Sequence, residues 1–252
     1  MFNIMFSIMS NVSTEIPIAT KQGDLLTYVA KPVGDGPWPG VVVIHDAIGM
    51  SRDMRNQADW LASEGYIVAA PDLFRGGTLL KCLRAMVFDY LTWQGDIAAD
   101  IETVRLWLSQ QADCTGRIGM IGFCMGGGFA LQLAPRKGFS ASSVNYGALP
   151  KDLETFLMGA CPIVASYGAK DISLRGAADQ LEQALTKLAI DHDVKEYPNA
   201  GHAFLNQPDP ADLPWLLTVL GKIVNTRYHE PSAGDARRRI LAFFAKHLKA
   251  GD

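Results

Sequence analysis

The sequence has few cysteines and none of the patterns in which cysteines build disulfide frameworks or metal sites. Its 252 residues include four cysteines, which lie far apart, with no CxxC pair and no histidine at metal-ligand spacing: Cys82, Cys114, Cys124 and Cys161. We therefore expect no disulfide-stapled fold and no structural zinc. This use of cysteine is typical of a reducing compartment, and the predicted location is cytoplasmic.

The sequence also lacks an excess of charge of either sign. Its 23 basic and 26 acidic residues give a net charge of −3, and charged residues make up only 19% of the chain. Proteins that bind nucleic acids usually present a basic face to the phosphates. We therefore expect no nucleic-acid partner.

No apolar run is long enough to cross a bilayer. The N-terminal segment MFNIMFSIMSNVSTEI is apolar, but no lysine or arginine precedes its apolar residues, as a signal peptide would require. Residues 1–18 are predicted to form a poorly ordered extension, with Met1 or Met9 as the native start. A membrane partner is not expected.

Apolar segments of two kinds alternate along the rest of the chain. Continuous apolar runs, typical of strands buried on both faces, occupy residues 40–46, 66–74 and 117–123. Residues 52–64 and 96–110 instead repeat apolar positions at helical spacing. The alternation predicts one α/β domain over 19–252, with a mostly parallel twisted sheet and helices on both faces. The proline-rich, apolar segment 206–224 is a candidate lid-like insertion.

CPIVASYG and HDVKEYP are two further predicted strands, at residues 161–168 and 192–198. Polar residues of reactive type lie at the ends of four of the predicted strands or directly after them. They are Asp46, Cys124, Asp171 and His202. Because ligands and reactive groups collect at the carboxyl ends of parallel strands, we expect these four side chains to meet at one edge of the sheet.

The stretch MIGFCMGGGF predicts a sharp turn from a strand into a helix, with Cys124 at its apex. Such a turn forces its central residue into a strained, exposed conformation, which only small neighbours such as Gly122 and Gly126 allow. The helix that follows would direct the N–H of Met125 toward the reacting centre. With the N–H of Ala47, it is the candidate oxyanion hole.

A thiol near its ordinary pKa is mostly protonated at neutral pH and needs a base. His202 is the candidate base, and Asp171 can fix its tautomer. Taken singly, Cys124 could be a buried filler, His202 a turn residue and Asp171 a helix cap. Together, in the order nucleophile, acid, histidine, they favour catalysis, whereas His45 is interpreted as a packed or hydrogen-bonded residue at a strand end.

The motifs VVVIHDAIGM, EGYIVAAPDLF, IGFCMGGGFA, YGAKD and AGHAFLN resemble the dienelactone hydrolases (carboxymethylenebutenolidases) over most of the chain. The resemblance implies an α/β-hydrolase fold and a triad of Cys124, Asp171 and His202. It also implies hydrolysis of a small ester or enol-lactone through a thioester acyl-enzyme, without a metal or an organic cofactor. We expect a small-molecule ester or lactone as substrate, and a monomer or weak homodimer.

The chain departs from the family's best-known members at two positions. Where they have a glutamate that contacts the resting thiol and takes part in activating it, this chain has Asp46. They also bind the substrate's free carboxylate with arginines, one of them four residues after the histidine, where this chain has Asn206. Arg84 is the candidate match to the other arginine, and Tyr146 is a further candidate for the wall of the substrate pocket.

Two other functions fit the same fold. A non-catalytic small-molecule-binding module would be expected to lack a triad residue or to block the turn at Cys124, and the sequence does neither. A redox-sensing thiol at Cys124 would call for a resolving cysteine nearby, and none lies close in sequence. A dinucleotide site is also disfavoured, because GFCMGGG matches the G-x-G-x-x-G pattern only loosely.

Overall fold

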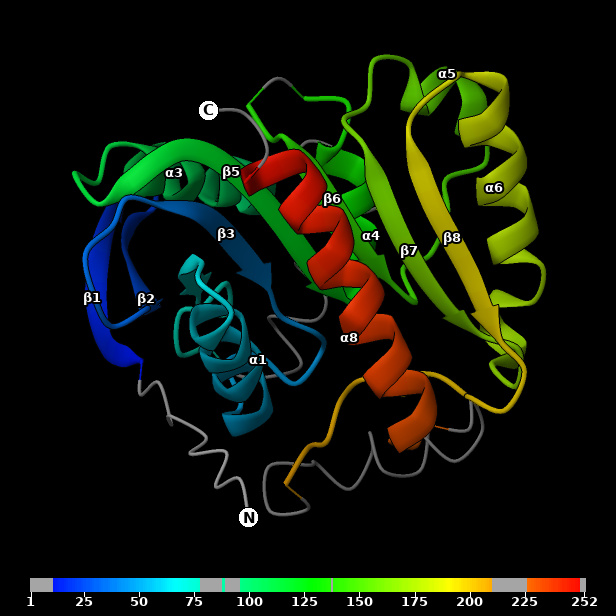
Figure 1. Cartoon of the computed structure of the whole chain (residues 1–252), viewed down its shortest axis with the longest axis horizontal. Helices are drawn as coiled ribbons and strands as arrows, with labels where there is room; N and C mark the ends of the chain where they lie inside the picture. The colour runs from blue at the N-terminus through cyan, green and yellow to red at the C-terminus, as the bar shows by residue number, and fades with distance from the viewer. Residues whose placement is uncertain (1–10, 78–87, 89–95, 137, 210–225, 250–252) are drawn as a thin grey trace, which may run out of the picture.

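The computed structural model describes residues 11–77, 88, 96–136, 138–209 and 226–249. They form one eight-stranded sheet in the order β1-β2-β4-β3-β5-β6-β7-β8, with helices on both faces (Figure 1). The strands are β1 (Val12–Thr20), β2 (Gly23–Lys31), β3 (Trp38–Ile44), β4 (Ile67–Pro71), β5 (Cys114–Phe123), β6 (Ala141–Asn145), β7 (Ile163–Gly168) and β8 (His192–Tyr197). From β4 to β8 all neighbours are parallel, whereas β2 is antiparallel to both β1 and β4. The predicted fold class is confirmed.

Helices cover both faces because the central strands are apolar on both. In β3, Val41 and Val43 pack in one core cluster, whereas Val42 and Ile44 pack in the other. The first cluster lies under α1 (Arg52–Ser63) and α8 (Glu230–Phe244), in front of the sheet in Figure 1. The second lies under α3 (Asp96–Ser109), α4 (Met125–Leu133), α5 (Leu153–Leu157) and α6 (Ala177–Lys187). Within the described residues, no helix is long and apolar enough to cross a membrane.

The antiparallel hairpin β1–β2 corrects the predicted limit of the N-terminal extension. Residues 12–18, expected to be poorly ordered, belong to β1, which pairs with β2 along its whole length. β-branched residues stand at alternate positions along β1, but only the side chain of Ile18 is fully buried. Backbone pairing to β2 therefore holds this edge strand more than core packing does.

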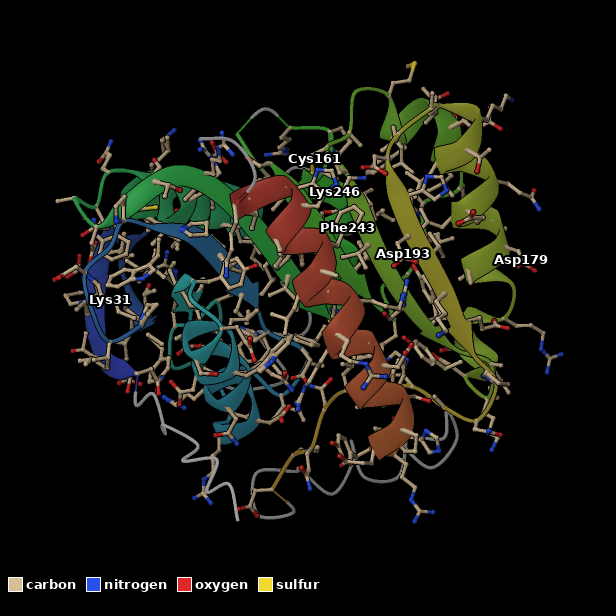
Figure 2. The ribbon with its side chains drawn as sticks, in the orientation of Figure 1. Lys31, Cys161, Asp179, Asp193, Phe243 and Lys246 are labelled. Carbon is tan, nitrogen blue, oxygen red and sulfur yellow. The ribbon has the colours of Figure 1, made fainter. Side chains whose placement is uncertain are left out.

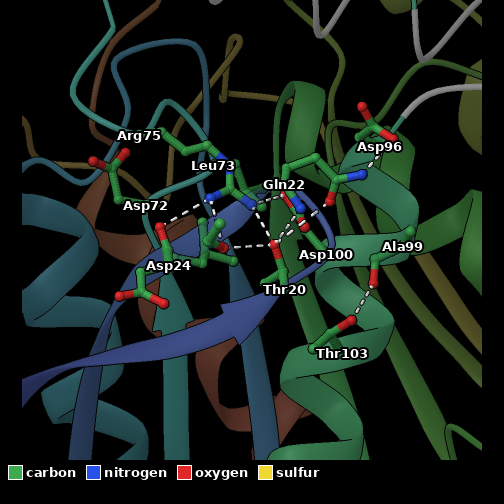
Figure 3. Close-up of polar contacts among 12 residues, drawn as sticks. Thr20, Gln22, Asp24, Asp72, Leu73, Arg75, Asp96, Ala99, Asp100 and Thr103 are labelled. Carbon is green, nitrogen blue, oxygen red and sulfur yellow. Dashed lines mark hydrogen bonds and ion pairs between the residues drawn. The ribbon is translucent and has the colours of Figure 1, made fainter.

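One arginine ties the β1–β2 turn to the helix α3. Arg75, in the left-handed region at φ 51°, donates to Asp100 at 2.7 Å and to the hydroxyl of Thr20 at 2.8 Å (Figure 3). The same guanidinium donates to the carbonyl of Asp24 at 2.9 Å. Since Asp100 is 3% exposed, this ion pair is shielded from water and fixes the hairpin at one end of the sheet.

At the other end of the sheet a second arginine bonds α8 to β8. Arg239 donates to both carboxylate oxygens of Asp193, at 2.7 and 3.0 Å, and to the hydroxyl of Tyr197 at 3.1 Å. Figure 2 shows Asp193 on β8 beside α8. The bidentate geometry fixes the direction of α8 across the front of the sheet.

Candidate active site

The turn at Cys124 has the geometry that the sequence predicts. β5 ends at Phe123, α4 begins at Met125, and Cys124 between them adopts φ 56° and ψ −115°. Its N–H donates to the carbonyl of Asn145 at 3.0 Å, and its carbonyl accepts from the N–H of Gly128 at 3.1 Å. A residue without a glycine's freedom is thus held in a strained conformation by bonds on both sides.

Three glycines make this turn sterically feasible. A Cβ on Gly122 would overlap the carbonyl of Gly126, and a Cβ on Gly126 would overlap the carbonyl of Ile44, at the end of β3. A Cβ on Gly127 would meet the carbonyl of Asn145 at 2.5 Å. The glycines therefore allow the start of α4 to pack closely against the ends of the neighbouring strands. This packing places Cys124 at the edge of the sheet.

Asp171 and His202 come from the loops that follow β7 and β8. The two are joined at 2.5 Å, from Nδ1 of His202 to Oδ2 of Asp171. The other carboxylate oxygen, Oδ1, accepts from the N–H and the hydroxyl of Ser173, at 3.0 and 2.5 Å. Burial by itself raises the pKa of Asp171, but the hydrogen bonds from His202 and Ser173 outweigh it and hold that pKa below its ordinary value.

The imidazole of His202 bonds to Cys124 as well as to Asp171. Burial opposes its protonation, but the hydrogen bonds to Asp171 and to Cys124, with the negative charge of both groups, raise the pKa of His202 to about 10. The three side chains thus form a bonded line from acid to base to thiol, in which a charged imidazole is stabilised.

Asp46 lies at the carboxyl end of β3. In the order of strands β3 is on one side of β5, which ends before Cys124, whereas β7 and β8, which precede Asp171 and His202, are on the other side. Its side chain is buried, and Oδ1 accepts one backbone hydrogen bond, from Ile48 at 2.8 Å. Burial raises the pKa of Asp46 to about 7, the N–H of Ile48 lowers it, the charge of Asp53 adds to the rise, and His202 opposes it. At neutral pH this carboxyl can therefore either hold or release a proton.

His45 has the structural role that was expected. The ring is fully buried, with Nδ1 at 2.7 Å from the carbonyl of Asp46 and Nε2 accepting from the N–H of Leu73 at 3.1 Å. This pattern requires the neutral tautomer with hydrogen on Nδ1. Burial lowers the pKa of His45, in keeping with that neutral state. The interpretation of His45 as a hydrogen-bonded strand-end residue is confirmed.

A pocket of about 260 Å³ opens beside the thiol. The described residues that line it are Cys124, Met125, Gly128, Tyr146, Ala148, Ser173, Leu174 and His202. Met125 is the first residue of α4, so its N–H has no acceptor within the helix and is available to a ligand in the pocket. Ala47 lies in the turn directly after β3, beside Asp46.

Comparison with known proteins supports the resemblance seen in the motifs. The profile of the "Dienelactone hydrolase family" matches residues 25–248, which is most of the chain. The chain belongs to the dienelactone hydrolase family. It is thus a member of a hydrolase family, as its motifs imply.

Relatives in this family cover almost the whole chain. A protein of Salmonella typhimurium named "Putative carboxymethylenebutenolidase" is 31% identical, over 94% of this chain and 88% of its own length. A protein of the same name from Escherichia coli is 31% identical, over 93% of this chain and 86% of its own. A crystal structure titled "Putative Dienelactone Hydrolase" from Klebsiella pneumoniae is 28% identical, with a TM-score of 0.76 over 94% of this chain and 99% of that one.

The side chain of Asn206 is directed away from the pocket. Asn206 is 2% exposed, and its side chain bonds to Tyr146 and Asp53 rather than lining the pocket as we predicted. Tyr146 does line the pocket. Arg84, the other candidate, lies outside the described residues, as does all of the 206–224 segment beyond residue 209.

Two residues beside the site were not predicted from the sequence. Ser173 follows Asp171 by two residues, a spacing at which aspartate commonly accepts from a backbone N–H, so this signal was present. Asp53 in the first turn of α1 looks like an ordinary helix-stabilising acid, and no sequence pattern separates it from one. In the parts of the chain that the structure describes, no group of three or more histidine, cysteine, aspartate or glutamate side chains could hold a metal ion.

Proposed function

We propose that the chain hydrolyses small esters or enol-lactones, with Cys124 as nucleophile, His202 as general base and Asp171 as the residue that orients the base. The observation that carries this proposal is the bonded line from Asp171 through His202 to Cys124 at the wall of a pocket. The membership of the chain in the dienelactone hydrolase family supports the same reaction class.

In the acylation half-reaction His202 takes the proton of the Cys124 thiol, and the sulfur attacks the carbonyl carbon of the substrate. The N–H of Met125, aided by the N-terminal end of α4 and by the N–H of Ala47, stabilises the oxyanion. The tetrahedral intermediate collapses to a thioester when the C–O bond breaks. The leaving oxygen takes its proton from His202, and in a lactone it stays attached to the acyl chain.

In the deacylation half-reaction His202 takes a proton from a water molecule, whose oxygen attacks the thioester carbonyl. The C–S bond then breaks, the carboxylic acid leaves, and the proton returns to Cys124. Asp171 holds its negative charge throughout because its pKa is lowered, so it can stabilise the imidazolium in both steps.

Asp46 supplies the pH dependence on the acid side. With a pKa of about 7 it changes charge at neutral pH, and its position after β3 places it near His202. We propose that its ionised form assists the loss of the thiol proton, in the manner of the family's glutamate. Activity should then rise with pH as Asp46 ionises.

The described wall of the pocket favours an apolar acyl group. Besides the reactive pair and Ser173, it presents Met125, Ala148, Leu174 and Tyr146. Since Asn206 is engaged elsewhere, position 206 supplies no anchor for a carboxylate. A panel of matched neutral and carboxylate-bearing esters, with cis- and trans-dienelactone, identifies the preferred substrate by kcat/KM.

The proposal is tested by substitution of the thiol. We expect Cys124→Ala to lower kcat for p-nitrophenyl acetate by roughly 10⁴-fold or more, as loss of a nucleophile does in comparable triads. A brief incubation of the unsubstituted protein with the ester should add one acetyl group to the peptide that contains Cys124, detected by mass spectrometry.

Cys161→Ala is the matched control. Cys161 lies outside the pocket lining, and burial raises the pKa of its thiol to about 12, so it should be inert. Full activity in Cys124→Ala, or acetylation at Cys161, would contradict the proposed function.

A further inference from the structure

Asp53 uses both of its carboxylate oxygens outside its own helix. It lies in the first turn of α1 and is 4% exposed. An acid in this position ordinarily stabilises the free N–H groups of the helix, but Ser51 already caps α1 by accepting from the N–H of Met54. Asp53 instead accepts from the side-chain amide of Asn206 at 2.6 Å and from the N–H of Gln207 at 3.0 Å.

The bond to Asp53 fixes which way the Asn206 amide points. A carboxylate only accepts, so the NH₂ group of Asn206 must face Asp53 and its carbonyl oxygen must face away. That carbonyl accepts from the hydroxyl of Tyr146. Burial raises the pKa of Tyr146, and the charges of Asp53, Asp46 and Cys124 add to the rise, so the hydroxyl stays a donor.

Tyr146 connects this hydrogen-bonded pair to the active site, because its ring lies beside that of His202. Its ring centroid lies 5.3 Å from that of His202, at an angle of 59°. Its backbone is in the left-handed region at φ 41°, and the side chain is 1% exposed. A strained backbone and a buried hydroxyl bond together hold the ring at one angle beside the imidazole.

We propose that Asp53 is a positioning residue of the active site, which acts through Asn206 and Tyr146 to hold the ring against which His202 lies. The inference rests on the proposed function, because the angle of His202 matters to the rate only if His202 is the base. Asp53 is absent from the described pocket lining, so it acts on the position of His202 through the intervening side chains and on Asp46 through its charge.

A second side chain of α1 also anchors the segment after His202, so that the effect of Asp53 on the Asn206 amide can be tested without releasing this segment. Gln57, one turn after Asp53, donates to the carbonyl of Leu205 at 3.1 Å. The backbone of the segment after His202 thus keeps an anchor to α1 when Asp53 is changed. Only Asp53 fixes the orientation of the Asn206 amide. An asparagine at position 53 has an NH₂ group that can donate to the Asn206 carbonyl, and the Asn206 amide could then rotate by 180°.

The charge of Asp53 provides a readout that a purely structural role would not move. Asp46 is faced by Asp53 from α1, by His202 from the loop after β8, by the N–H of Ile48 and by Tyr146. Because Asp53 raises the pKa of Asp46, Asp53→Asn should shift the acid limb of the kcat/KM profile to lower pH. Tyr146→Phe leaves every charge in place and should leave that limb unmoved.

The experiment compares Asp53→Asn, Tyr146→Phe and the double variant in the full chain, with p-nitrophenyl acetate as substrate. We expect each single variant to lower kcat about tenfold, the size of effect that follows the loss of a buried hydrogen bond, with little change in KM. Because both act through one path, the double variant should lose no more than the more damaged single variant. Asp59→Asn, an equal change of charge on the same helix whose partners are Asn11 and Tyr28, should leave the rate unchanged.

The outcomes separate the two proposals. Unchanged kcat in Asp53→Asn, or losses that add in the double variant, would overturn the positioning role even where Cys124→Ala is inactive. An active Cys124→Ala would overturn the proposed function instead. If thermal unfolding shows that Asp53→Asn does not fold, Tyr146→Phe decides: a tenfold lower kcat with an unmoved acid limb supports the inference, and an unchanged kcat overturns it.

Discussion

Two aspartates at the edge of this sheet show how different partners can give one side chain opposite properties. Asp46 follows β3 and Asp171 follows β7, and both are at least nine-tenths buried. Burial is the largest influence on each and would raise the pKa of each. Yet the pKa of Asp171 is lowered, whereas that of Asp46 is raised to about 7.

The difference lies in what each loop offers the carboxyl group. The loop after β7 gives Asp171 the N–H and hydroxyl of Ser173, and the loop after β8 adds the imidazole of His202. The loop after β3 gives Asp46 only the N–H of Ile48, and α1 places a second acid near it. Charged and hydrogen-bonding neighbours, rather than depth, thus decide which acid stays ionised and which can exchange a proton.

The largest effect is expected from Asp171→Asn. The amide keeps the size of the side chain but offers an N–H group to Nδ1 of His202, which turns the imidazole to the wrong tautomer and removes the charge that stabilises it. We expect kcat to fall roughly 10³- to 10⁴-fold, and the pKa of His202, followed by NMR of the imidazole, to fall from about 10.

The control for this variant is Asp191→Asn. Asp191 also has a lowered pKa, which its hydrogen bond from Lys246 produces, but it lies outside the pocket lining. It should leave kcat unchanged. If Asp171→Asn and Asp191→Asn were equally active, the bond to His202 would have no catalytic role.

Asp46→Asn should change stability in the opposite direction to Asp171→Asn. The folded pKa of Asp46, about 7, lies above the ordinary value of 3.8, so between these values the native protein holds a proton that the unfolded chain has lost. Stability therefore falls as pH rises through this window, by up to about 4 kcal/mol. The pKa of Asp171 is shifted downward, so its contribution is present above pH 3.8 and is lost as pH falls below it.

Urea unfolding of the protein and both variants on either side of this window measures the contrast. Relative to the unsubstituted protein, Asp46→Asn should gain stability as pH rises toward 8, because asparagine stays neutral and can still accept from Ile48. Asp171→Asn should lose stability at the same pH. A pH-independent difference for Asp46→Asn would show that Asp46 is ionised in the native state throughout.

The two loops also differ in how far the sequence predicts them. Cys124, Asp171 and His202 were found because each follows a predicted strand, and in a parallel sheet strand ends converge at one edge. The partners of Asp46 could not be found in this way. Asp53 lies on the far side of a loop and a helix turn, and its contacts with the segment after His202 depend on how α1 packs, which no local pattern encodes.

Asn206 shows the same limit, whereas the hairpin does not. β-branched residues stand at alternate positions along β1, the pattern of a strand, but they were interpreted together with the apolar segment before them as one poorly ordered extension. Asn206 was interpreted as a pocket residue because of its distance from His202 along the chain, but the side chain turns inward to Asp53 and Tyr146. Local patterns predict strands buried on both faces, whereas the packing of distant polar groups follows from the assembled fold.

The smallest effect expected is that of Ser173→Ala, which makes the partners of Asp171 more like those of Asp46. It removes the hydroxyl donor at 2.5 Å but keeps the N–H of residue 173, so Asp171 should remain ionised with a less depressed pKa. We expect kcat to fall roughly five- to tenfold, the loss of one hydrogen bond to a charged group. Ser232→Ala, which removes the serine partner of His229 on α8, is the matched control. A fall as deep as that of Asp171→Asn would mean that the Ser173 hydroxyl, rather than His202, keeps Asp171 charged.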